Sequence, residues 1–261
     1  MPLIKLSGEF DCFFETLLKT NKIMKVEIWS DVACPFCYIG KRHFEKALSQ
    51  FTEKEHIEIE WKSYLLDPEY VYDPENPVTE TEYIAARKGI SQDEARQMFT
   101  SITRMASMAG LTYDFDKVIV ANTFDSHKII QLAKEKKLGD AAEERFFQAF
   151  FVNGENLNEK ETLVKIALEI GLTESDVNEA LTNDKYAYEV KNDIQEASQI
   201  GVRGVPFFVF DRKYSVSGAQ PVTTFTQTLE KSFAEWKEKN QLNPLINVAE
   251  GSTCDIDGKC E

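Results

Sequence analysis

The feature that most constrains the fold is a strand that passes directly into a helix. Met24–Ser30 (MKVEIWS) alternates apolar and charged side chains, which is the period of a β-strand. From Phe36 onward the apolar positions fall three or four residues apart, which is the period of a helix. A second alternating segment, residues 57–61, follows one helix length later. This order predicts a βαβ unit whose two strands are parallel and adjacent.

The rest of the chain separates into a helical part and a second β-rich part. Residues 77–200 have the pattern of successive helices, with no convincing strand among them. Residues 205–210 and 213–217 have strand composition around a tight turn at 211–212, and a last helix follows Pro221. The sequence therefore predicts an α/β domain that is interrupted by an all-helical insertion.

This reading divides the chain into four parts. The N-terminal part has no strand partner, so it either frays or forms one short helix, and translation starts at Met1 or Met24. The parts are an N-terminal extension (1–23), a discontinuous α/β domain (24–76 and 201–240), a helical insertion domain (77–200) and a C-terminal tail (241–261).

Charge and hydropathy restrict the partners and the location. The net charge of −14 would repel phosphate backbones and anionic lipids, so we expect neither a nucleic acid nor a membrane partner. No stretch approaches the roughly 20 apolar residues of a transmembrane helix, and charges interrupt residues 1–23 too often for a signal peptide. We therefore predict a cytoplasmic protein.

Five cysteines are too few for a disulfide scaffold. No pattern in the sequence indicates an oligomeric state.

A Cys-x-x-Cys motif, Cys34-Pro35-Phe36-Cys37, lies where the first strand becomes the first helix. At a helix start, unpaired backbone N–H groups and the helix dipole stabilise a thiolate, and Pro35 suits the first turn. Cys37 lies one turn further along the same face. We predict that Cys34 attacks a disulfide and that Cys37 resolves the mixed disulfide. Open α/β sheets present their sites at this edge, so an exposed thiol pair is expected.

The remaining cysteines leave two interpretations open. A zinc site would need a second pair with ligand spacing, and the gap between Cys254 and Cys260 is too wide for one, so no metal is predicted. Cys254 and Cys260 form either a second dithiol that exchanges electrons with the first, or an incidental pair in a frayed tail.

His127 also has two interpretations. It lies near the start of a helix, where it would line a cleft opposite Cys34 and stabilise the thiolate or transfer a proton. The alternative is a purely structural helix start, with Asn122 or Thr123 as the N-cap and Asp125 complementing the helix dipole.

Several segments resemble the DsbA-like oxidoreductases of the FrnE group. They are SDVACPFCYIGKRHFEKAL, GVRGVPFFVFDRKYSVSGAQP, SYLLDPEY and ANTFDSHKIIQLA, and the resemblance spans residues 24–236. It implies a thioredoxin-like fold interrupted by a helical domain, with Pro206 as a cis-proline that faces the cysteines. Pro35, Phe36, Val205 and Pro206 would then contact the substrate, with the Val205 backbone pairing to an extended peptide.

The resemblance also bears on cofactor, partners and alternatives. It implies protein-disulfide oxidoreductase or isomerase activity on polypeptide or small-molecule thiols without a resident cofactor, with glutathione as a candidate co-substrate. Phe36 replaces the histidine of DsbA-type enzymes, which predicts a weaker oxidant. Related kappa-type glutathione transferases and 2-hydroxychromene-2-carboxylate isomerases carry serine in place of Cys34. The alternatives to disulfide exchange are a glutathione-dependent transferase or isomerase activity of this kind and a chaperone-like client-binding module. The sequence also leaves open whether the protein oxidises, reduces or isomerises its substrates.

Overall fold

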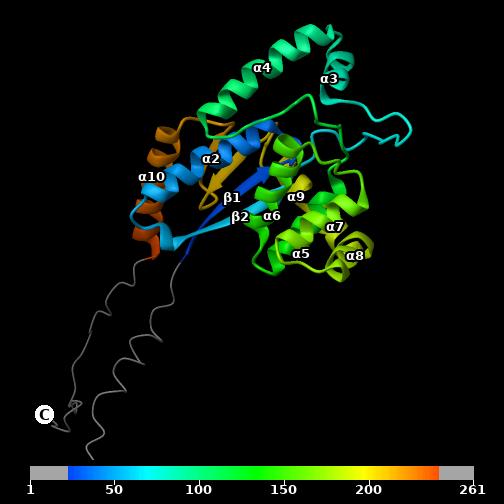
Figure 1. Ribbon diagram of the computed structural model, residues 1–261. Helices are drawn as coiled ribbons and strands as arrows, with labels where there is room; N and C mark the ends of the chain where they lie inside the picture. The colour runs from blue at the N-terminus through cyan, green and yellow to red at the C-terminus, as the bar shows by residue number, and fades with distance from the viewer. Residues whose placement is uncertain (1–22, 241–261) are drawn as a thin grey trace, which may run out of the picture.

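The computed structural model describes residues 23–240 of the chain (Figure 1). Its sheet has the strand order β2-β1-β3-β4. β1 (Met24–Ser30) pairs in parallel with β2 (Ile57–Ser63) and antiparallel with β3 (Phe207–Phe210), which in turn pairs antiparallel with β4 (Tyr214–Ser217). The βαβ unit and the C-terminal hairpin predicted from the sequence are confirmed.

Helices connect and cover these strands. Between β2 and β3 the described chain has helices and connecting segments, with one isolated bridge between Thr79 and Ile119. The helical elements are α2 (Pro35–Gln50), η1 (Lys54–His56), α3 (Glu80–Lys88), α4 (Gln92–Met108), α5 (Phe124–Glu135), α6 (Gly139–Phe147), the π-helical turn η2 (Gln148–Asn153), α7 (Lys160–Glu169), α8 (Glu174–Thr182), α9 (Asp184–Gln199) and α10 (Val222–Asn240).

The sheet has a different helical layer on each face. Successive side chains of a strand point to opposite faces, so Val26 and Ile28 pack with α2 and α10, whereas Trp29 packs on the face covered by α9. Figure 1 shows α2 and α10 side by side against the sheet, with α3 and α4 projecting beyond them. At the carboxyl ends of β1 and β2, Asp31 and Ser63 accept hydrogen bonds from Thr123 and Gln131, so this edge of the sheet meets α5.

The second β-rich part differs slightly from its prediction. β3 begins at Phe207, two residues later than expected, because Pro206 has no N–H group for strand pairing. Asp211 and Arg212 have φ angles of 48° and 51°, which is the left-handed conformation that a two-residue hairpin turn needs.

Parts of the predicted organisation lie outside the described residues. The structure does not describe residues 1–22 of the predicted N-terminal extension or the tail from residue 241. The predictions for Cys254 and Cys260 fall in that tail. The division into domains therefore stays a prediction. Among residues 23–240, no helix is both long enough and apolar enough to cross a bilayer.

Candidate active site

A carboxylate organises the turn between β1 and α2. Asp31 follows the last residue of β1, and its Oδ1 accepts hydrogen bonds from the Ala33 backbone N–H at 3.1 Å and the Thr123 hydroxyl at 2.8 Å. Its Oδ2 accepts a hydrogen bond from the Leu66 N–H at 2.7 Å. The turn before the dithiol, the loop after β2 and the start of α5 are thereby fixed at one edge of the sheet.

The two cysteines lie at the N-terminal end of α2, and both are free thiols. Cys34 is the N-cap residue, with extended backbone angles, and Pro35 is the first helical residue. The Cys37 N–H donates to the Cys34 carbonyl at 3.0 Å, which places Cys37 within the first turn.

The loop before β3 approaches the dithiol from the opposite side. The peptide bond between Val205 and Pro206 is cis, as the family resemblance implies, and the Cys34 thiol donates to the Val205 carbonyl at 3.5 Å. Gly40 permits this approach, because a Cβ atom there would lie 3.0 Å from Pro206 Cγ. The residues predicted for the dithiol and for substrate contact therefore lie together at the start of α2. They are Cys34, Pro35, Phe36, Cys37, Val205 and Pro206.

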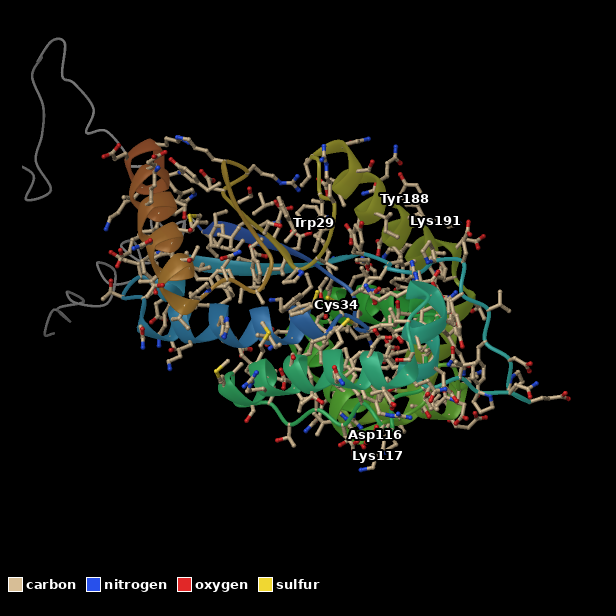
Figure 2. All side chains as sticks on the ribbon, turned by 90° about the horizontal axis from the view of Figure 1, so that it is seen from above. Trp29, Cys34, Asp116, Lys117, Tyr188 and Lys191 are labelled. Carbon is tan, nitrogen blue, oxygen red and sulfur yellow. The ribbon has the colours of Figure 1, made fainter. Side chains whose placement is uncertain are left out.

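The expectation of an exposed thiol pair is wrong. Cys34 is 3% exposed and Cys37 is 1% exposed. The Tyr113 hydroxyl donates to the Pro35 carbonyl at 2.8 Å, so the segment after α4 lies across the first turn of α2. Figure 2 shows Cys34 at the start of α2, with α4 running alongside that helix. The helical insertion thus covers the dithiol.

Burial changes the acid–base properties of the resolving cysteine. Burial raises the pKa of the Cys37 thiol well above its usual range, and the neighbouring Cys34 raises it further. The Asp31 backbone N–H and the Ser30 hydroxyl lower this pKa but do not outweigh burial. The Cys37 thiol is therefore protonated at neutral pH and must lose a proton before it can attack a disulfide.

His127 lies in the interior, whereas one prediction placed it in the lining of a cleft opposite Cys34. Its side chain is 0% exposed, and its Nε2 is 3.6 Å from Asp31 Oδ1. The structural interpretation of this helix start has the positions right, since Thr123 is the N-cap residue of α5 and Asp125 lies in its first turn. The Thr123 hydroxyl donates to Asp31 and makes no cap hydrogen bond, whereas the Asn122 side chain accepts a hydrogen bond from the Phe124 N–H at 3.0 Å.

Three buried side chains around the dithiol and His127 have no assigned role in the sequence analysis: Asp31, Tyr113 and Glu143. Asp31 had a usable signal, because it directly follows a buried strand at the edge where sites form. Tyr113 and Glu143 had none, because only the fold of the helical insertion brings them to α2 and α5. Among residues 23–240, no three or more His, Cys, Asp or Glu side chains are grouped so as to hold a metal ion.

Comparisons with known proteins agree with this geometry. A family model described as a DSBA-like thioredoxin domain matches residues 25–230. The uncharacterized protein YwbO of Bacillus subtilis is 28% identical over 190 residues, covering 70% of this chain and 85% of that protein.

Two solved structures are also similar. The structure of a probable DsbA oxidoreductase from Streptomyces coelicolor shares 38% identity and a TM-score of 0.77, covering 91% of this chain and 98% of that chain. The cytosolic disulfide reductase DsbM from Pseudomonas aeruginosa, solved with GSH, shares 17% identity and a TM-score of 0.57, covering 80% and 99% of the two chains. At that identity the likeness to DsbM concerns the fold alone.

Proposed function

The chain belongs to the family of DsbA-like thioredoxin domains, and from that premise we propose that it exchanges disulfides through Cys34 as attacking thiol and Cys37 as resolving thiol. The thioredoxin-like α/β fold predicted from the sequence is that of this family. The observation that carries the proposal is the position of Cys34 as the N-cap of α2, opposite the Val205 carbonyl and one turn before Cys37.

The proposed reaction has two exchange steps. The Cys34 thiolate attacks one sulfur of a substrate disulfide, a bond forms between the two sulfurs, and the second substrate sulfur leaves as a thiolate. The Cys37 thiolate then attacks the Cys34 sulfur and releases the first substrate sulfur. The substrate disulfide is reduced and the Cys34–Cys37 pair is oxidised; the same steps run backwards when the oxidised pair meets a dithiol.

We expect small-molecule disulfides, with glutathione disulfide as the representative, to be better substrates than folded proteins. Burial of Cys34 supports this preference, because a large substrate would have to displace the segment around Tyr113. The glutathione named with DsbM is a property of that protein, and it supports the choice of glutathione as the first probe.

Trapping of the mixed disulfide tests the assignment of the two thiols. With glutathione disulfide, the Cys37→Ser variant should retain one glutathionyl group on Cys34, detectable by mass spectrometry, because no resolving thiol is present. The Cys34→Ser variant should form no adduct at this site and should lose turnover in a coupled reduction assay. Full turnover by the Cys34→Ser variant would overturn the assignment.

The same variants separate the proposed function from its alternatives. A glutathione-dependent transferase or isomerase would not need a resolving thiol, so its activity would survive the Cys37→Ala substitution. A chaperone-like module would hold unfolded clients equally well with and without Cys34. We expect instead that Cys37→Ala abolishes disulfide turnover.

A further inference from the structure

A cleft that the exchange reaction does not use lies between the start of α5, α9 and the loop after β2. Its volume is about 540 Å³, which is within the range of small-molecule sites. Its lining side chains come from residues 65–72, 122–125, 157–158 and 191–194, and we call it the α5–α9 cleft. Neither cysteine lines it, and Figure 2 shows Lys191 on α9, apart from Cys34 at the start of α2.

Two asparagine side chains hold the walls of this cleft together. The Asn122 amide donates to the Tyr70 carbonyl at 2.9 Å, and its oxygen accepts from the Phe124 N–H at 3.0 Å. The Asn158 side chain accepts from the Asn122 N–H at 3.1 Å and donates to the Val120 carbonyl at 2.9 Å. Because these amide groups are occupied within the protein, other side chains must recognise a ligand.

The ammonium group of Lys191 is one candidate, because it has no acidic partner. Its Nζ lies 6.0 Å from the centre of the Phe124 ring, and no carboxylate of residues 23–240 forms an ion pair with it. No acidic residue stands three or four positions away on α9, where the neighbours are Ala187, Tyr188, Ile194 and Gln195. The chain has 44 acidic and 30 basic residues, so a cation without a carboxylate at a cleft is available for an anionic ligand.

The other polar side chains of the lining add to this preference for an anion. Among the lining residues, Asp125 carries the one carboxylate, and it pairs with Lys128 at 2.6 Å. The Tyr72 hydroxyl accepts a hydrogen bond from the Asn156 amide at 2.8 Å, and a hydroxyl that accepts one bond can still donate another. The lining therefore offers one positive charge and one hydroxyl donor.

The remainder of the lining determines the body of the ligand. Two ammonium groups, of Lys128 and Lys191, already lie over the Phe124 ring, at 5.5 and 6.0 Å from its centre. A ligand would therefore contact the aliphatic part of the lining, which consists of Leu65, Pro68, Leu157 and Ile194. A second negative charge on the ligand would find no further unpaired cation in this lining.

We propose that the α5–α9 cleft binds an aliphatic monocarboxylate. The carboxylate pairs with Lys191 and accepts a hydrogen bond from the Tyr72 hydroxyl, while the hydrocarbon chain lies against the aliphatic side chains. This site is separate from the dithiol, and the inference does not depend on the proposed function.

Titration of the ¹⁵N-labelled full chain with butyrate, hexanoate and octanoate, followed by NMR, tests the site. The backbone signals of Tyr72, Phe124 and Ile194 should shift and saturate. The affinity should rise about threefold for each added CH₂ group, because each one leaves water for the aliphatic wall. Hexanamide has the same chain without the charge and should bind about tenfold more weakly than hexanoate.

A charge-removing variant connects the carboxylate to Lys191. Lys191→Gln should weaken hexanoate binding about tenfold and leave hexanamide binding unchanged, because only the carboxylate uses the ammonium group. Lys88→Gln, at an exposed position on α3, makes the same change in net charge and should bind hexanoate as wild type does. Cys34→Ser should also bind it normally, since the thiol is not part of the cleft.

Several results would overturn the proposal. They are equal affinities of wild type and Lys191→Gln for hexanoate, equal affinities of wild type for hexanoate and hexanamide, and the absence of saturable shifts at the cleft residues. None of them bears on disulfide exchange, which the trapping of the mixed disulfide on Cys34 tests separately. A failure of that trapping would in turn leave the carboxylate site standing.

Discussion

The Tyr113 hydroxyl ties the segment that covers the dithiol to the first turn of α2. Tyr113 is 5% exposed, stacks on Phe151 with ring centroids 4.8 Å apart, and donates to the Pro35 carbonyl at 2.8 Å. One such hydrogen bond contributes about 1 kcal/mol, which corresponds to about a fivefold change in an opening equilibrium. The hydroxyl therefore restricts the access of reagents to Cys34.

We predict that Tyr113→Phe increases the rate at which iodoacetamide alkylates Cys34 by about fivefold, because the segment opens more often. Mass spectrometry of the labelled peptide measures this rate. Tyr188→Phe is the matched control, since the Tyr188 side chain is 70% exposed and distant in sequence from the dithiol. An unchanged rate in Tyr113→Phe would mean that the hydroxyl does not limit access.

Glu143 gives a second prediction at the residue scale. Burial raises the pKa of its carboxyl from 4.5 to about 7, so the folded state keeps the proton to higher pH than the unfolded state. The free energy of unfolding therefore falls as the pH rises from about 4.5 to 7, by roughly 3 kcal/mol from this group. Glu143→Gln cannot ionise and should avoid that loss.

Urea unfolding at two pH values tests this expectation. Relative to wild type, Glu143→Gln should gain roughly 3 kcal/mol more at pH 8 than at pH 5. Glu161→Gln, at an exposed position on α7, should show no such difference between the two pH values. Parallel pH profiles for Glu143→Gln and wild type would show that Glu143 is ionised at little cost.

At the scale of elements, an ion cluster joins the dithiol helix to the helical insertion. Lys41 on α2 is 2% exposed and lies 3.3 Å from Asp140 and 3.1 Å from Glu144 on α6. Burial lowers the pKa of Lys41, but Asp140, Glu45 and Glu144 together raise it above its usual range. The Tyr38 hydroxyl also donates to Glu144 at 2.7 Å.

We predict that Lys41→Ala lowers the free energy of unfolding by about 1–3 kcal/mol. The loss should be smaller than for a fully buried pair, because the partner carboxylates remain partly exposed to water. Urea unfolding gives the value, and Lys46→Ala, at an exposed position on the same helix, is the control. Equal effects of the two substitutions would contradict a stabilising link between α2 and α6.

The sequence predicted the elements that depend on local pattern. The period of Met24–Ser30, the helix from Pro35 and the turn at Asp211 and Arg212 all depend on neighbouring residues, and the structure has each of them. It did not predict that Tyr113 crosses the first turn of α2. That contact depends on how α4 and the following segment fold back onto α2, and periodicity carries no such long-range information.

The same limit explains the prediction for His127. The pattern placed His127 correctly near the start of a helix but could not give the burial of that helix face. The face is buried because α5 packs against α6, α8 and α9 while its first turn meets Asp31 at the end of β1. Exposure of the dithiol was misjudged for the same reason, since the covering segment lies almost 80 residues away in sequence.

At the scale of the whole molecule, the helical insertion acts as a cover over the carboxyl edge of the sheet. α4 runs alongside α2 (Figures 1 and 2). The segment that follows α4 carries Tyr113, whose hydroxyl donates to the Pro35 carbonyl in the first turn of α2. A small disulfide needs only a local opening of this segment to reach Cys34. A folded protein substrate would need a larger displacement of the insertion, which costs more free energy.

We therefore predict that substrate size, more than the chemistry of the disulfide, sets the rate of exchange. With this enzyme as the reductant, we compare the second-order rate constant for glutathione disulfide with that for insulin. The ratio of the two should be about tenfold higher than the same ratio measured with dithiothreitol, which corresponds to ~1.4 kcal/mol of additional free energy to open the cover for insulin. Tyr113→Phe should reduce this excess, because it loosens the cover without altering either thiol. The contrary result is an equal ratio of the two rate constants with this enzyme and with dithiothreitol. The cover would then open as freely for insulin as for glutathione disulfide.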